Sequence, residues 1–174
     1  EVAKILYGNK DINSVIICTG RKNLLDQWTQ EIYEWKEKCN FEDLIVHRQY
    51  DNHRDIRKFV ASNENKILLI SRNAKWLAEL FGGLEKAKKE KCLIIHDEIH
   101  GLGADSFESN LPKEGGQSDF KYRLGLSATP EREHDEEGTE FIISEIGPVI
   151  YTFKLQDAIK KGILCPFNYH PISF

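Results

Sequence analysis

The segment LIIHDEIH, residues 93–100, runs from aliphatic positions directly into two adjacent carboxylates. A strand covered on both faces of a parallel sheet has such a continuous apolar pattern, and ligands gather at the carboxyl ends of such strands. Consecutive strand side chains point to opposite faces, so Asp97 and Glu98 can divide two tasks. One can hold Mg²⁺ while the other orients or deprotonates water, as phosphoryl transfer from a nucleotide requires. The alternative is a strand that ends in a solvated acidic turn.

A second apolar run, YRLGLSATP at residues 122–130, ends in small hydroxyl residues and is stopped by proline. The hydroxyls of Ser127 and Thr129 can bridge the acidic strand end to a neighbouring site, and Pro130 prevents the strand from continuing. The alternative is an ordinary strand end at which Ser and Thr side chains cap the backbone.

Apolar runs alternate with segments of helical periodicity along the chain, which predicts an α/β fold with a doubly wound parallel sheet. The predicted strands are 15–19, 44–47, 67–71, 93–96, 123–127 and 149–153. Helices are predicted at 51–61, 74–80 (stopped by Gly82-Gly83), 138–146 and 155–161. Leu25, Trp28, Ile32 and Trp35 recur on one helical face, so the tryptophans are predicted to be core side chains rather than platforms for base stacking.

The composition is that of one globular domain. The chain has 174 residues, of which 40% are hydrophobic and 30% charged. No apolar run approaches the length needed to cross a bilayer, and no signal peptide is recognisable, so an intracellular protein (cytoplasm, nucleoid or nucleus) is expected. The scattered cysteines, with Cys18 inside one predicted buried strand and Cys92 at the start of another, indicate reduced core thiols.

The formal net charge of −4 argues against a strong standing affinity for nucleic acid, because binding to the phosphate backbone depends on clustered Lys and Arg. Nucleic-acid contacts would have to be local. The basic run at 86–91 is interpreted as a solvated helix end. Arg21 and Lys22, at the carboxyl end of the first strand, are better placed, although an exposed helix-entry turn explains them equally well.

Together, the segments at 93–100 and 122–130 resemble the sequence motifs of superfamily 2 helicases and translocases. DEIH at 97–100 resembles the DExH box (motif II), and SAT at 127–129 resembles motif III of the first RecA-like domain. SVIICTGR at 14–21, followed by LLDQW at 24–28, is similar to motif Ia, and KILLISR at 66–72 lies where motif Ib would. The resemblance implies a RecA-like sheet of the P-loop NTPase type with helices on both faces, spanning residues 1–174 as a single domain.

The resemblance also implies roles for individual residues. Glu98, Asp97 and His100 would be catalytic, with Asp97 holding Mg²⁺ through water for the hydrolysis of ATP. Ser127 and Thr129 would couple hydrolysis to strand movement. Contacts to the nucleic-acid backbone would come from Thr19, Gly20, Arg21, Ser71 and Arg72. The expected partners are nucleic acid, DNA rather than RNA, and a second RecA-like domain, towards which residues 163–174 would begin the connection.

Within the superfamily, the residues after the SAT motif are similar to the xeroderma pigmentosum B-type branch, which has an Arg-Glu-Asp motif linked to duplex opening. Here Arg132 and Glu133 are followed by His134, with Asp135 one place late. An exposed charged turn is the alternative for this segment.

Superfamily 2 ATPases carry a glycine-rich phosphate loop that ends in Gly-Lys-Ser/Thr, and the sequence contains no such segment. Residues 1–7 could continue the helix that follows that loop. We therefore expect the N-terminal motor domain of a longer ATP-dependent helicase or translocase, lacking its phosphate-loop portion and inactive alone. The alternative is a non-catalytic nucleic-acid-binding or regulatory module. A metallohydrolase using His96, Asp97 and His100 is geometrically poor, and His96 is predicted to be a core histidine with its hydrogen bonds satisfied.

Overall fold

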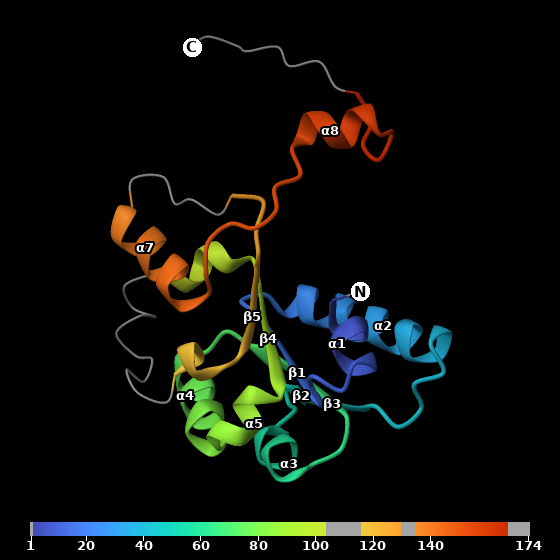
Figure 1. Cartoon of the computed structure of the whole chain (residues 1–174), viewed down its shortest axis with the longest axis vertical. Helices are drawn as coiled ribbons and strands as arrows, with labels where there is room; N and C mark the ends of the chain where they lie inside the picture. Colours follow the sequence, from blue (N-terminus) through green and yellow to red (C-terminus); the bar gives the residue numbers. More distant parts are fainter. Residues whose placement is uncertain (1, 104–115, 130–134, 167–174) are drawn as a thin grey trace.

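Five parallel strands form the centre of the fold, in the order β2-β3-β1-β4-β5 (Figure 1). They are β1 (Ser14–Thr19), β2 (Ile45–Gln49), β3 (Lys66–Ser71), β4 (Cys92–Asp97) and β5 (Tyr122–Leu126). The computed structural model describes residues 2–103, 116–129 and 135–166. In a parallel sheet all carboxyl ends meet at one edge, so the residues that follow β1, β3, β4 and β5 are brought together.

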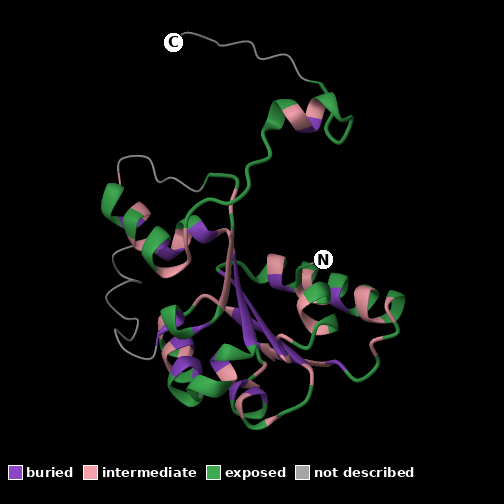
Figure 2. Ribbon diagram, viewed as in Figure 1, coloured by how far each residue is buried: buried purple, intermediate pink, exposed green. Residues whose placement is uncertain are grey.

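The central strand β1 is buried along its whole length, because it pairs with β3 on one side and β4 on the other. Its aliphatic side chains alternate between two apolar clusters, one on each face of the sheet. Figure 2 shows the buried residues concentrated along these central strands. The predicted fold class, an α/β parallel sheet with helices on both faces, is confirmed.

Helices cover the two faces. The cluster on one face includes residues of α1 (Val2–Gly8) and α2 (Lys22–Lys38), and the cluster on the other includes residues of α3 (Ile56–Ala61) and α4 (Ala74–Gly83). The remaining elements are α5 (Lys86–Glu90), the 3-10 helices η1 (Ile99–Gly103) and η2 (Gln117–Asp119), α7 (Glu136–Glu145) and α8 (Leu155–Lys160). Helix α4 begins where the Asn73 side chain accepts a hydrogen bond from the Trp76 amide at 3.1 Å, a regular N-cap.

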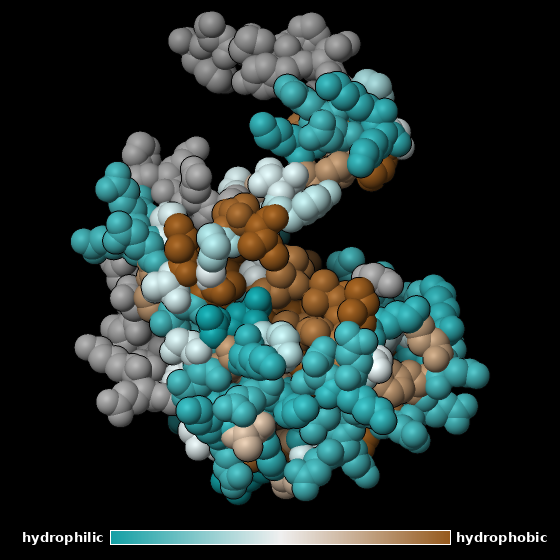
Figure 3. Space-filling view, in the orientation of Figure 1, coloured by the Kyte–Doolittle hydropathy of each residue, from teal (hydrophilic) through white to brown (hydrophobic). Residues whose placement is uncertain are grey.

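The predicted strand at 149–153 is wrong. These residues form no strand, and Val149, Ile150 and Tyr151 are 58%, 83% and 76% exposed. A strand requires a neighbour that satisfies its backbone hydrogen bonds, and none of the described strands pairs with this segment. Figure 3 shows the apolar side chains of the visible face in a band across the middle of the molecule, between hydrophilic surfaces.

Helix α4 ends at Gly83, so the glycine pair marks its end, three residues beyond the predicted helix end at residue 80. The interpretation of the basic run at 86–91 as a solvated helix end fails for Lys89. In this basic run, Lys89 of α5 is only 3% exposed, and its Nζ lies 3.5 Å from a carboxylate oxygen of Asp119 in η2. The long stem of lysine can be buried while its charge finds a partner, which composition alone does not reveal.

Among the described residues, no helix is long and apolar enough to cross a membrane. All four cysteines are free thiols, and Cys18 and Cys92 are buried as expected. Burial raises the pKa of Cys18 to about 11 and that of Cys92 to about 12, so both are protonated core side chains.

Candidate active site at the carboxyl ends of the strands

Asp97 is the last residue of β4, and both of its carboxylate oxygens accept a hydrogen bond. The Trp28 indole Nε1 donates to Oδ2 over 2.8 Å, and the Glu98 backbone amide donates to Oδ1 over 3.1 Å. An ionised carboxylate offers about four acceptor positions, so both oxygens keep further lone pairs. The side chain is therefore oriented but retains the capacity to bind a cation.

Glu98 leaves the strand in a left-handed backbone conformation, with φ of +52°. This region costs a residue other than glycine about 1–3 kcal/mol, and such residues cluster at functional sites. The strand ends at Asp97, so the prediction that Asp97 and Glu98 are consecutive strand residues on opposite faces does not apply to Glu98. The Glu98 side chain is half-exposed, and its Oε2 lies 3.3 Å from Nδ1 of His100. Asp97, Glu98 and His100 thus lie together on the turn that follows β4.

Arg72 connects this turn to the ends of neighbouring strands. Its Nη2 donates to the Asp97 carbonyl oxygen over 2.5 Å, and its backbone amide donates to the Thr19 carbonyl over 2.8 Å. A side chain added at Gly101 would place Cβ 2.5 Å from Arg72 Nη1, so the guanidinium occupies the space that this glycine leaves. Arg72 therefore joins the ends of β1, β3 and β4, and its guanidinium points inwards rather than towards solvent.

His96, one residue before Asp97, is fully buried on the opposite face of the sheet. Burial and then the positive charge of Arg72 lower its pKa to about 3, and contact with the Gln117 side chain acts in the other direction. Neither ring nitrogen makes a hydrogen bond of regular geometry. His96 is thus a neutral core histidine at physiological pH, as predicted, but the predicted hydrogen bonds to its ring nitrogens are not formed.

The other residues assigned to nucleic acid differ in accessibility. Thr19 is completely buried, and its hydroxyl has no hydrogen-bond partner in the described part of the chain. Gly20 and Arg21 are exposed directly beyond it, and Ser71 is half-buried in register with Thr19. Of the five residues assigned to nucleic acid, only Gly20 and Arg21 are therefore exposed.

Ser127 and Thr129 follow β5, which pairs with β4 so that Leu126 lies opposite Asp97. The hydroxyls thus begin one residue beyond the strand position that neighbours the acidic turn. Ser127 Oγ accepts a hydrogen bond from the Thr129 amide over 3.1 Å, which is a local cap. Arg132 and Glu133, the predicted duplex-opening residues, lie outside the described residues.

Mg²⁺ in nucleotide sites is commonly held by one or two carboxylates, waters and substrate phosphates. Asp97, oriented and only half-buried, fits that chemistry. In residues 2–103, 116–129 and 135–166, no group of three His, Cys, Asp or Glu side chains could hold a metal ion.

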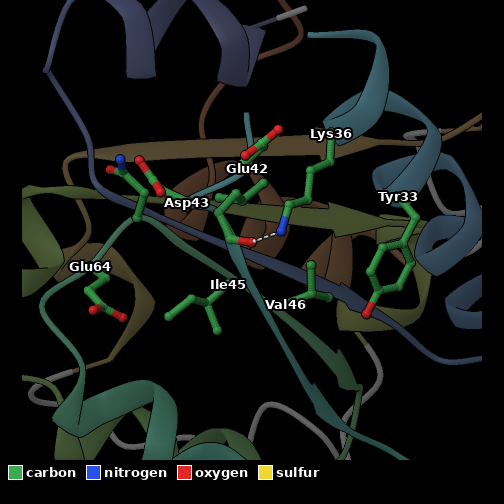
Figure 4. Close-up of a pocket in the computed structure, with 9 residues that line it drawn as sticks. Tyr33, Lys36, Glu42, Asp43, Ile45, Val46 and Glu64 are labelled. Carbon is green, nitrogen blue, oxygen red and sulfur yellow. Dashed lines mark hydrogen bonds between the residues drawn. The ribbon is translucent and has the colours of Figure 1, made fainter. Parts of the chain in front are cut away.

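Two hollows lie at the amino ends of the strands, on the opposite end of the sheet from the acidic turn. One, of about 720 Å³, is formed beside the start of β2 and includes Tyr33, Lys36 and Glu64 (Figure 4). There Lys36 Nζ donates to the Leu44 carbonyl over 2.8 Å. The second, of about 580 Å³, includes Asn13 and Lys91, which precede β1 and β4. Neither hollow contains a residue of the acidic turn.

Sequence reasoning missed Trp28 and Arg72 as parts of this site. The helical spacing of Trp28 identified a core side chain, which it partly is. A signal was nevertheless present, because the indole N–H of a buried tryptophan needs an acceptor. The assignment of Arg72 to nucleic acid rests on its place in the segment that resembles motif Ib. Its inward contacts depend on the strand order, which the sequence does not specify.

A family model described as "Type III restriction enzyme, res subunit" matches residues 1–132 of the chain. No curated protein sequence matches significantly. Among solved structures, a de novo designed protein of P-loop NTPase fold, determined by solution NMR, is 14% identical and has a TM-score of 0.36. The alignment covers 89% of this chain and 99% of the designed one, a likeness too distant to support an inference.

Proposed function

Because the chain belongs to the family of the type III restriction enzyme res subunit, we propose that it is the first RecA-like motor domain of an ATP-dependent superfamily 2 nucleic-acid helicase or translocase. The observation that carries this proposal is the acidic turn after β4. There Asp97 is oriented by two hydrogen-bond donors, and a left-handed residue presents Glu98 beside His100.

We assign distinct roles to the residues of the turn. Asp97 binds Mg²⁺, which when bound neutralises charge on the nucleotide phosphates. Glu98, half-exposed and free of strand pairing, orients or deprotonates the attacking water. His100, 3.3 Å from Glu98 Oε2, senses the state of that carboxylate. Ser127 and Thr129, beyond the strand that pairs with β4, transmit the nucleotide state to the nucleic-acid track.

The proposed track is DNA, contacted first at Gly20 and Arg21, with Arg132 and Glu133 as a duplex-opening element of the xeroderma pigmentosum B type. A second RecA-like domain and a phosphate loop complete the motor in a longer protein. A non-catalytic RecA-like module is the second candidate, favoured by one observation, the lack of Gly-Lys-Ser/Thr in these 174 residues. A glycine-rich phosphate loop encoded before Glu1 would decide for the motor.

The 174-residue chain alone is expected to show no ATP turnover above background. Loss of a single group that stabilises developing charge costs about 2.7–4 kcal/mol of barrier, and both a phosphate loop and a second-domain arginine are needed. Steady-state phosphate release measures this, with the longer protein as the positive control. Turnover of about 1 s⁻¹ from the 174-residue chain would show that its own residues suffice and would contradict the assignment.

Replacing both Ser127 and Thr129 by alanine in the longer protein is expected to spare most ATP hydrolysis but to reduce strand displacement per ATP. The hydroxyls lie next to the acidic turn without belonging to it, so their loss should weaken coupling more than chemistry. Displacement of a labelled strand is measured together with ATP consumption. An unchanged ratio would mean that the hydroxyls only cap the end of β5, as the bond between Ser127 and Thr129 allows.

A further inference from the structure

Helix α2 carries a hydrogen-bond donor to the acidic turn. Trp28 lies between Leu25 and Ile32, which are 0% and 5% exposed, so the helix face that packs on the sheet also fixes the indole. From this anchored ring, Nε1 reaches Oδ2 of Asp97 over 2.8 Å. An indole N–H can only donate and an ionised carboxylate can only accept, so the contact is a charge-assisted hydrogen bond.

This bond restricts the carboxylate in a direction that the backbone does not. The Glu98 amide holds Oδ1, and Trp28 holds Oδ2, so rotation of the carboxylate plane would break one bond or the other. The remaining lone pairs therefore have a defined direction before any cation arrives. Partners that orient a metal-binding side chain are commonly worth 10- to 100-fold in metal affinity or activity.

We propose that Trp28 is a positioning residue that holds the Asp97 carboxylate ready for a divalent cation. The inference rests on the proposed function, because it assumes that Asp97 is the metal-binding carboxylate. It adds a role for α2, an element that otherwise serves as a cover for the sheet.

The other two tryptophans of the chain provide internal controls. Trp35 lies further along the same helix and packs edge-on against Phe41, with ring centroids 5.8 Å apart. Trp76, on α4 on the other face, stacks with Arg54 at 4.9 Å. Neither ring has a hydrogen bond to an acidic side chain among the described residues. Trp35→Phe therefore makes the same substitution as Trp28→Phe at a position that has no hydrogen bond to Asp97.

The test uses nuclear magnetic resonance of the 174-residue chain, in which paramagnetic Mn²⁺ broadens signals of nearby protons. We expect Mn²⁺ to broaden the Trp28 indole signal at concentrations that leave the Trp35 and Trp76 signals sharp, and excess Mg²⁺ to restore it. Asp97→Asn should abolish this selective broadening. If the wild-type chain shows no selective broadening, or if Asp97→Asn leaves it intact, Asp97 does not hold a divalent cation in this chain, and the assignment of Asp97 to Mg²⁺ fails together with the inference.

The inference itself is decided by Trp28→Phe, with the backbone amide of Glu98 as the reporter of bound Mn²⁺. Trp28→Phe is expected to raise the Mn²⁺ concentration for half-broadening by about 10- to 100-fold, whereas Trp35→Phe leaves it unchanged. Thermal unfolding of both variants shows that each is folded. If Trp28→Phe shifts the titration no more than Trp35→Phe while Asp97→Asn still abolishes binding, the proposed function stands and the positioning role of Trp28 is refuted.

Discussion

Glutamine in place of Glu98 is expected to lower ATP turnover by the longer protein about 100- to 10,000-fold, the usual contribution of a general base. Glutamine keeps the size of the side chain but cannot accept a proton, and the half-exposed side chain supports no core packing. ATP affinity should therefore change little. Asp97→Asn is expected to act differently, because it removes the charge that binds Mg²⁺ and should weaken ATP binding only when Mg²⁺ is present.

The measurement combines nucleotide affinity, with and without Mg²⁺, and turnover for both variants. Glu90→Gln is the matched control, since Glu90 is exposed at the amino end of β4, away from the turn. Its turnover should equal that of the unchanged protein. Identical profiles for Glu98→Gln and Asp97→Asn would contradict the division of roles between the two carboxylates.

Phe120→Ala is expected to lower the free energy of unfolding by about 3–5 kcal/mol, as large-to-small changes at buried aromatic residues do. Phe120 is completely buried just before β5, and its ring packs edge-on against Phe81 with centroids 5.5 Å apart. Lys89 Nζ lies 5.9 Å from the same ring centroid, so a cation–π contact is lost as well.

Urea denaturation of the 174-residue chain measures this change. Tyr151→Ala is the control, because Tyr151 is 76% exposed and its removal should change stability by less than about 0.5 kcal/mol. A loss below about 1 kcal/mol for Phe120→Ala would show that Phe120 does not fill the core beneath β4 and β5.

The sequence predicts a strand correctly where the pattern of residues within the segment is sufficient to identify it. The runs at 15–19, 67–71 and 93–96 each consist of apolar residues followed by one polar residue, a pattern that predicts a buried strand. In the structure all three lie inside the sheet. The run at 149–153 has a similar composition and forms no strand. Its side chains satisfy strand propensity, but pairing requires a neighbouring backbone, and composition does not specify one.

For the candidate site, the sequence placed the carboxylates at the end of β4 but not the contacts that orient them. Trp28 and Asp97 are separated by 69 positions, and Arg72 and Asp97 by 25, so both contacts depend on which strands and helices become neighbours. The left-handed conformation of Glu98 was equally hidden. Glycine or asparagine usually marks such a position, and here a glutamate occupies it.

The guanidinium of Arg72 has a consequence for anyone who wishes to graft this site onto another protein. It binds the Asp97 carbonyl, fills the space left by Gly101, and extends from a residue whose amide is tied to Thr19. The acidic turn is thus one part of an interlocked assembly drawn from three strands. A scaffold that received the turn would also need an arginine directly after the strand two places away and a glycine that makes room for it. Without them it would have the sequence of the motif but not its conformation.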